Sequence, residues 1–225
     1  MISLYSGTPG SGKSFHIADK VANGALVGRQ YICNFPVDLE DFSIRLIFRP
    51  MAKHKCFEKL FSKIPHHITH RKIKAPPIYL DTSDITVKWL IEYAEQNHSV
   101  GKEGQTTVVI DEAGIKFNCR SFSDKDRQPW LDFFAKHRHY GFDFILISQS
   151  DRQLDRQIRY CIEQEYKHYK LANFNWFGRL LSWLAGGGLF IVHEYWYGFH
   201  GERNGTDVIR YSRRVAGIYD THYKF

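Results

Sequence analysis

The sequence lacks the features that mark secreted, membrane-spanning or repeat proteins. Its four cysteines lie far apart, without a Cys-x-x-Cys pair, so we expect reduced thiols of a cytosolic protein rather than a disulfide framework. The longest apolar run, residues 180–192, contains three glycines and is too short to cross a bilayer. No basic leader of a signal peptide is expected at Met1, and no internal repeat or low-complexity tract is visible. These absences favour a globular domain that does not cross a membrane unaided.

The composition is that of a globular chain with a modest basic excess. Of its 225 residues, 43% are apolar, 24% are charged and 16% are aromatic. This length suits one sizeable α/β domain, with or without a small appendage. The formal net charge of +7 fits an anionic partner such as a nucleotide, nucleic acid or lipid headgroups, and equally fits a solvated basic face.

Apolar patterns alternate between strand-like and helix-like segments over the first two thirds of the chain. This alternation predicts an α/β fold with a mostly parallel central sheet flanked by helices, followed by a smaller β-containing C-terminal region. Residues 44–48 fit either a strand or a helix. The expected strands are 2–6, 31–34, 106–110, 142–147, 166–169 and 190–197, and the expected helices are 14–27, 83–97, 129–139 and 153–161.

A phosphate-binding loop is the most specific local pattern. The segment Gly7-Thr8-Pro9-Gly10-Ser11-Gly12-Lys13-Ser14 fits G-x-x-x-x-G-K-[ST], and it lies between a predicted strand and a predicted helix that continues with Phe15. Glycines let successive N–H groups point at phosphate oxygens, and the helix N-terminus adds a positive dipole. We expect these nine residues to bind a nucleotide, with Lys13 on the β- and γ-phosphates and Ser14 on Mg²⁺.

Two acidic residues follow a predicted buried strand. They supply the carboxylates that a phosphate-binding loop needs to bind Mg²⁺ and to activate water. The run Thr107-Val108-Val109-Ile110 leads directly into Asp111 and Glu112. Asp111 is expected to hold the Mg²⁺ shell, and Glu112 to orient or deprotonate the attacking water. The presence of Glu112 directly after Asp111, the expected Mg²⁺ ligand, favours an ATP-hydrolysing motor over a kinase that acts on small molecules.

Further polar residues are candidates for sensing or stabilising the γ-phosphate. Gln149 follows the predicted strand 142–147 and is a candidate sensor. The sequence contains no Asn-Lys-x-Asp pattern for guanine, which favours ATP over GTP. A finger arginine from a neighbouring subunit often stabilises the transition state. The sequence leaves five candidates open, among which Arg138 lies near the end of a predicted helix: Arg120, Arg127, Arg138, Arg156 and Arg159.

From Asp111 onward the sequence contains a series of specific strings. They are Asp111-Glu112-x-Gly114-x-x-Phe117-Asn118-x-Arg120-Ser121, Asp124-Lys125-x-Arg127-Gln128-Pro129, Arg138-x-x-Gly141-x-Asp143, Gln149, Asp155-x-Gln157-x-Arg159 and Tyr219-Asp220-Thr221. In these strings the sequence resembles the assembly proteins of filamentous bacteriophages, the zonula occludens toxin (Zot) family. Together with the phosphate loop, the similarity covers most of the chain, although residues 38–105 and 163–215 match only in general character.

The resemblance implies an ATPase domain on the cytoplasmic face of the host inner membrane. It implies action with the phage export channel and coat proteins during virion assembly and extrusion, where coat subunits replace the single-stranded-DNA-binding protein. Family members continue into a membrane span and a periplasmic tail, so we expect either a cytoplasmic fragment or a shorter relative, and we favour the fragment. The toxin activity of some relatives is attributed to their C-terminal region and is not assigned to this chain.

Two regions outside these motifs leave alternatives open. We expect residues 1–162 to form the ATPase core, with a basic insertion at about 50–77, and residues 163–225 to form a β-rich extension. The histidines and lysines of the insertion suit DNA, an anionic membrane or solvent, while their spacing argues against zinc. The aromatic residues of the extension suit a membrane-apposed surface or a second small core, and we favour the core.

The sequence therefore predicts an ATP- and Mg²⁺-dependent ATPase that drives phage assembly, acting as a homo-oligomer such as a ring. Two other functions fit the same motifs. One is a nucleotide-gated adaptor that docks to membrane export partners without sustained hydrolysis. The other is a DNA-translocating motor of the packaging type, whose activity would be stimulated by DNA and would depend steeply on salt.

Overall fold

The computed structural model describes residues 1–53, 62–118, 124–174, 176–184, 188–198 and 202–219. Its eight strands are β1 (Ile2–Ser6), β2 (Gln30–Cys33), β3 (Ile78–Tyr79), β4 (Thr106–Ile110), β5 (Phe142–Ile147), β6 (Gln164–Lys170), β7 (Leu189–Trp196) and β8 (Arg203–Arg210). They form one sheet in the order β3-β2-β4-β5-β1-β6-β7-β8. Neighbours from β3 to β6 pair in parallel, and β7 and β8 add antiparallel pairs.

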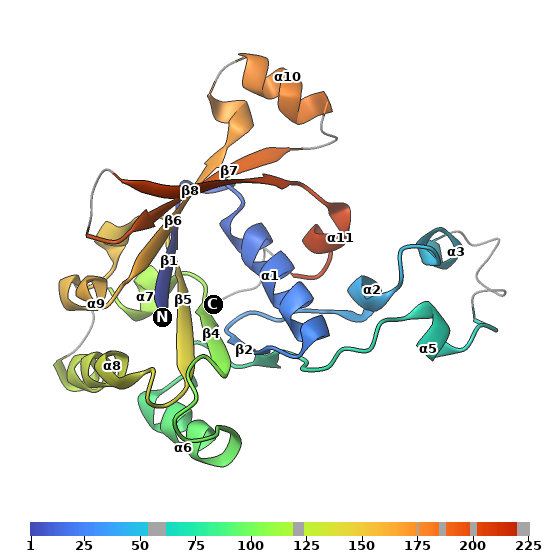
Figure 1. Ribbon diagram of the computed structural model, residues 1–225. Helices are drawn as coiled ribbons and strands as arrows, with labels where there is room; N and C mark the ends of the chain where they lie inside the picture. Colours follow the sequence, from blue (N-terminus) through green and yellow to red (C-terminus); the bar gives the residue numbers. More distant parts are fainter. Residues whose placement is uncertain (54–61, 119–123, 175, 185–187, 199–201, 220–225) are drawn as a thin grey trace.

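Helices cover both faces of this sheet (Figure 1). The α-helices are α1 (Lys13–Val27), α2 (Glu40–Ser43), α3 (Arg49–Lys53), α5 (His66–Thr69), α6 (Val87–Asn97), α7 (Ala113–Lys116), α8 (Asp124–Lys136), α9 (Arg156–Tyr160), α10 (Trp176–Leu184) and α11 (Arg213–Ala216). Helix α1 lies on one face, and α6 and α8 lie on the other. The mostly parallel α/β architecture predicted from the sequence is confirmed.

The core is divided between the two faces because successive strand residues point in opposite directions. On β4, Val108 and Ile110 pack with the aromatic residues of α8, whereas Val109 packs with Ile17 and Val21 of α1. All three β4 residues are fully buried. Burial on both sides explains why this strand is a continuous apolar run, and it fixes the position of the two acids that follow it.

Several helix boundaries differ from the sequence predictions. Helix α6 begins after Thr86, whose side chain accepts a hydrogen bond from the backbone N–H of Trp89, and not at residues 83–84. Helix α8 begins at Asp124 and contains Pro129 within it, although the sequence suggested that this proline starts the helix. Residues 44–48 form neither a helix nor a strand; Ile44 makes an isolated bridge with His70.

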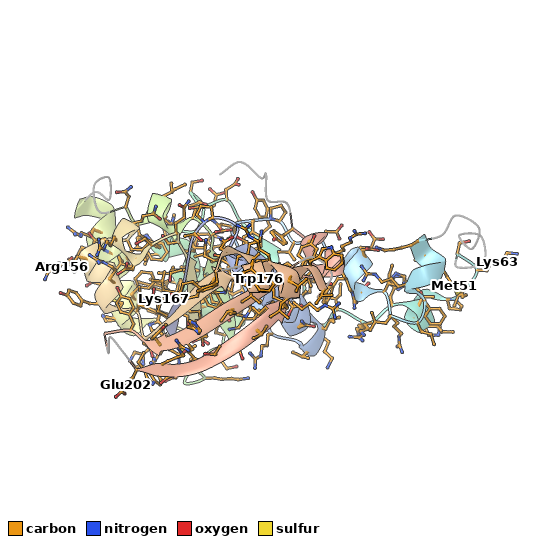
Figure 2. All side chains as sticks on the ribbon, turned by 90° about the horizontal axis from the view of Figure 1, so that it is seen from above. Met51, Lys63, Arg156, Lys167, Trp176 and Glu202 are labelled. Atoms are coloured by element: carbon orange, nitrogen blue, oxygen red, sulfur yellow. The ribbon has the colours of Figure 1, made fainter. Side chains whose placement is uncertain are left out.

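The basic insertion forms an arm that projects from the sheet. Helices α2, α3 and α5 lie along it, and Met51 and Lys63 lie near its far end (Figure 2). The arm returns to α1 where the N–H groups of Lys74 and Ala75 both donate to the carbonyl oxygen of Ala25. His54 and Cys56, considered above for zinc, lie outside the described residues. Among the residues that the structure describes, no three metal-ligating side chains come together.

The C-terminal strands continue the central sheet. Strand β6 pairs in parallel with β1, so β6, β7 and β8 contribute directly to the sheet that carries the phosphate loop. The expectation of a second aromatic core is wrong for α10, because Trp176 and Trp183 are 74% and 75% exposed. The division of the chain at residues 162 and 163 remains a prediction.

Candidate functional site

The phosphate loop connects the carboxyl end of β1 to the start of α1, as the sequence predicts. Gly12 caps α1 in the left-handed conformation, with a φ of 92°. A Cβ atom there would lie 2.7 Å from the ring of Phe190 on β7. A Cβ atom on Gly7 would lie 2.5 Å from the carbonyl oxygen of His168 on β6. The loop is therefore backed by the C-terminal strands, and glycine is required at both positions.

Lys13 folds back over this loop. Its Nζ donates hydrogen bonds to the carbonyl oxygens of Gly7, at 2.7 Å, and Thr8, at 3.2 Å. Burial lowers the pKa of Lys13, and the nearby carboxylates of Asp111 and Glu112 oppose that shift. The ammonium group is thus held at the loop by weak neutral acceptors, which a phosphate oxygen would replace with a charged one.

Ser14 and Asp111, which are 97 positions apart in the sequence, meet beside the loop. Ser14 Oγ donates a hydrogen bond of 3.0 Å to Asp111 Oδ2. Burial raises the pKa of Asp111, while hydrogen bonds from the backbone of Glu112 and from Ser14, together with the charge of Lys13, oppose the shift. A hydroxyl and a carboxylate at this contact are the oxygen ligands that Mg²⁺ prefers.

Glu112 has a strained backbone. Its φ of 48° makes it the non-glycine residue with positive φ in the part of the chain that the structure describes. Its N–H donates to Asp111 Oδ1 at 2.8 Å, and it caps the short helix α7. Such conformations persist where the surrounding structure enforces them, often at functional sites. At this residue the chain turns from the direction of β4 into helix α7, directly after Asp111.

Asn34 was missed by sequence reasoning, yet it fixes the position of Asp111. It is 2% exposed and follows β2, the strand next to β4. Its Oδ1 accepts from the N–H of Asp111 at 2.7 Å, and its Nδ2 donates to the Asp111 carbonyl oxygen and to Thr82 Oγ1, both at 2.9 Å. The available signal was a polar residue directly after a buried strand.

Gln149 lies at the loop, as the sequence suggested. Its carbonyl oxygen accepts a hydrogen bond of 3.4 Å from the N–H of Gly7, and its side chain is exposed. With Thr8, Lys167 and Tyr169, it lines a cavity of about 350 Å³ beside the loop. Buried Glu165 also lines this cavity and accepts a hydrogen bond of 2.6 Å from Ser6 Oγ.

Phe15 and Arg138 are not brought to the loop. Phe15 is 4% exposed and packs against Phe190 and Tyr211 in the core, so its side chain supports α1 from within. Arg138 pairs with Glu163, which accepts a hydrogen bond from the N–H of Ile2 at the amino end of β1. This is the opposite end of β1 from the phosphate loop, so Arg138 does not serve the site of its own chain.

The other candidate arginines make contacts within the chain. Arg127 pairs with the buried carboxylate of Asp155, and Arg159 lies 3.6 Å from Asp151. Arg156 donates to the hydroxyl of Tyr160 at 3.2 Å. Arg120 lies outside the described residues. These contacts do not single out one arginine as a finger.

The loop has room and donors for a phosphate group. Ser11 Oγ is buried and has no hydrogen-bond partner in the described part of the chain. An orphaned hydroxyl in such a loop is a donor that a phosphate oxygen would satisfy. The residues present therefore fit a nucleoside triphosphate on the loop, with Mg²⁺ at the contact of Ser14 and Asp111.

Comparison with known proteins places residues 1–183 in the family described as zonular occludens toxin (Zot). The Gene 1 protein of Enterobacteria phage I2-2 is 35% identical over 96 residues, which are 41% of this chain and 26% of that protein. The Gene 1 protein of Salmonella phage IKe is 36% identical over 85 residues, 36% of this chain and 23% of that protein. The chain thus matches about a quarter of the length of these relatives.

Solved structures share the fold at low sequence identity. The N-terminal domain of zonular occludens toxin from Neisseria meningitidis has a TM-score of 0.51 at 16% identity, covering 97% of this chain and 98% of that one. The DNA-packaging ATPase from Sulfolobus turreted icosahedral virus has a TM-score of 0.51 at 15% identity, covering 92% and 95%. A DnaB-like replicative helicase has a TM-score of 0.60 at 12% identity, covering 95% and 56%. The predicted P-loop NTPase fold is confirmed.

Proposed function

The chain belongs to the zonular occludens toxin family, and we propose on that basis that it binds and hydrolyses ATP to drive filamentous phage assembly. One observation carries the ATPase part of the proposal. Two segments 97 positions apart place Ser14 Oγ 3.0 Å from Asp111 Oδ2, directly beside Lys13 of the loop. A chance glycine-rich turn would have no reason to meet an acid at the end of a buried strand.

The side chains divide the chemistry among them. The N–H groups of the loop and the ammonium of Lys13 hold the phosphates, and Ser14 and Asp111 hold Mg²⁺. Bound there, Mg²⁺ supplies neutralisation of the phosphate charge. Glu112, fixed by its strained turn after Asp111, orients the attacking water and accepts its proton. Gln149, at the cavity beside Gly7, contacts the γ-phosphate or the water.

The site needs a further positive charge to stabilise the transition state. Neutral carbonyl acceptors hold Lys13, and the chain's own Arg138 lies at the far end of β1. We therefore assign the missing charge to an arginine of a neighbouring copy in a homo-oligomer such as a ring. Arg138 meets one condition for this role, because its side chain is half exposed.

We infer the biological setting from the family. The resemblance of this chain to the assembly proteins of filamentous phages supports work at the cytoplasmic face of the host inner membrane. The export channel, the coat proteins and the single-stranded DNA with its binding protein are the partners that such work requires. Among the described residues, none of the helices combines the length and the hydropathy of a membrane-spanning segment.

Steady-state ATP hydrolysis, measured across protein concentration, tests this function. We expect activity that rises faster than linearly with protein, because each site is completed by a neighbouring copy. Lys13→Ala should abolish turnover, whereas Lys88→Ala, at an exposed lysine that pairs with Glu92 far from the loop, should leave it unchanged. Tight ATP binding without turnover at any concentration would instead indicate a nucleotide-gated adaptor.

A further inference from the structure

Helix α10 has its large apolar side chains on the outside. Trp176, Leu180, Trp183 and Leu184 follow one another at helical spacing and are 74%, 41%, 75% and 64% exposed. The side turned toward the protein carries Ser182, which is 6% exposed, and the similarly buried Gly178. A surface helix of a globular domain normally has the reverse arrangement, so this apolar face calls for an explanation.

The exposed face extends beyond the helix itself. Phe174, in the turn before α10, is 59% exposed. It contacts the ring of Tyr169 at the end of β6, with the ring centroids 5.9 Å apart. The 3-10 turn η3 (Leu171–Asn173) joins β6 to this region, and Arg179 Nε donates to the carbonyl oxygen of Ala172 at 3.4 Å. The apolar face is therefore attached to the sheet by ordered contacts.

The segment of the chain that carries this face has no acidic side chain. From residue 166 to residue 193 the sequence contains no aspartate or glutamate, whereas it contains Lys167, Lys170 and Arg179. Lys167 is partly neutralised by Glu165 at 3.4 Å, which leaves Lys170 and the exposed Arg179 beside the apolar residues. Tryptophans flanked by cations are the side chains that favour the interface between a bilayer and water.

The position of α10 leaves it open to a flat surface. In Figure 1 it lies beyond the ends of β6 and β7, away from the helices that cover the sheet and from the arm. Figure 2 looks down on this side of the molecule, with Trp176 and Lys167 on it and the arm with Met51 and Lys63 extending to one side. Strand β6 is parallel to β1, so their carboxyl ends lie on the same side of the molecule. Helix α10 follows the carboxyl end of β6, and the phosphate loop follows the carboxyl end of β1.

We propose that α10 is an interfacial anchor that lies in the headgroup region of an anionic lipid bilayer and turns the nucleotide-binding edge of the domain toward the membrane. With nine residues, the helix is far too short to span a bilayer but long enough to bury its apolar face among the headgroups. Lys170 and Arg179 then meet lipid phosphates. The same helix of a second copy fits less well, because its segment carries the same basic residues and no acid to pair with Lys170 and Arg179.

Co-sedimentation with lipid vesicles tests this proposal independently of the ATPase function. The probes are vesicles of phosphatidylglycerol and phosphatidylcholine in equal parts, and vesicles of phosphatidylcholine alone. We expect binding to the anionic vesicles that weakens with salt. Replacing both Trp176 and Trp183 with alanine should weaken binding by about 100-fold, from about tenfold for each buried indole. Trp196→Ala is the matched control, because Trp196 is 48% exposed on β7 and should change binding less than about twofold.

Two further measurements keep the test decisive. The thermal unfolding midpoint of the double variant should equal that of the parent, since both side chains are exposed in the free protein. Arg179→Glu, which leaves the tryptophans in place, should weaken binding to the anionic vesicles and remove most of its salt dependence. The proposal would be overturned if the parent protein did not bind the anionic vesicles. It would also be overturned if Trp196→Ala weakened vesicle binding as much as the double variant does. A change in oligomeric state with unchanged vesicle binding would assign the face to a second copy and overturn it too.

Discussion

Asn34→Ala tests whether the neighbouring strand positions Asp111 and Glu112, the acids to which we assign the chemistry. The substitution removes three side-chain hydrogen bonds of 2.7 to 2.9 Å and leaves the peptide N–H and carbonyl of Asp111 without these partners. Because Asn34 is 2% exposed, water does not readily replace them. At about 1 kcal/mol or more for each lost bond, with buried groups left unpaired, we expect a loss of about 3 kcal/mol in the free energy of unfolding.

Urea denaturation measures this loss of stability. ATP hydrolysis measured on the same preparations shows whether the site remains active. Asn23→Ala is the matched control, because Asn23 is exposed and bonds to Asp19 one turn earlier on α1. It should change stability by less than about 0.5 kcal/mol. Hydrolysis should fall in Asn34→Ala under conditions where the variant is still folded. A stability loss below about 1 kcal/mol, or normal hydrolysis by the folded variant, would refute the role assigned to Asn34.

Two further predictions concern the loop and its surroundings. Gly12→Ala should abolish nucleotide binding in a fluorescent-nucleotide titration, because its Cβ would meet the Phe190 ring at 2.7 Å; Gly101→Ala, at a φ of 77° in open space, should bind normally. His16 and His168 share a hydrogen bond of 2.9 Å, and burial lowers their pKa values to about 4 and about 3. Since the unfolded chain binds these protons near pH 6.5, stability should be full above pH 7 and fall by about 4 kcal/mol at pH 5. Urea midpoints measured at both pH values check this, and His16→Gln should flatten the change.

The local part of the site was predictable because its signals are local. The glycines of the phosphate loop, Lys13 and Ser14 all lie in one short segment, which makes the loop recognisable as a motif. The buried strand before Asp111 is recognisable as an apolar run. The sheet followed from the same alternation of strands and helices. Asn34 was not predictable in this way, because its role exists only once β2 lies beside β4.

Boundaries and surfaces were harder to predict for physical reasons. Pro129 fits the first turn of a helix, but α8 begins at Asp124 and accommodates the proline farther along. Helical spacing of apolar residues in 176–184 shows that α10 is amphipathic, but not whether its apolar face turns inward or outward. The expectation of a buried aromatic core failed there because the small residues Gly178 and Ser182 take the inner side.

Single-turnover ATP hydrolysis by the parent protein and by Glu112→Gln tests the central claim most directly. The substitution keeps the size of the side chain and removes its ability to accept a proton. We predict that both proteins bind ATP with similar affinity and that the variant converts bound ATP to ADP at least about 100-fold more slowly. Hydrolysis by Glu112→Gln at the rate of the parent would contradict the account, as would a parent protein that binds ATP and never hydrolyses it.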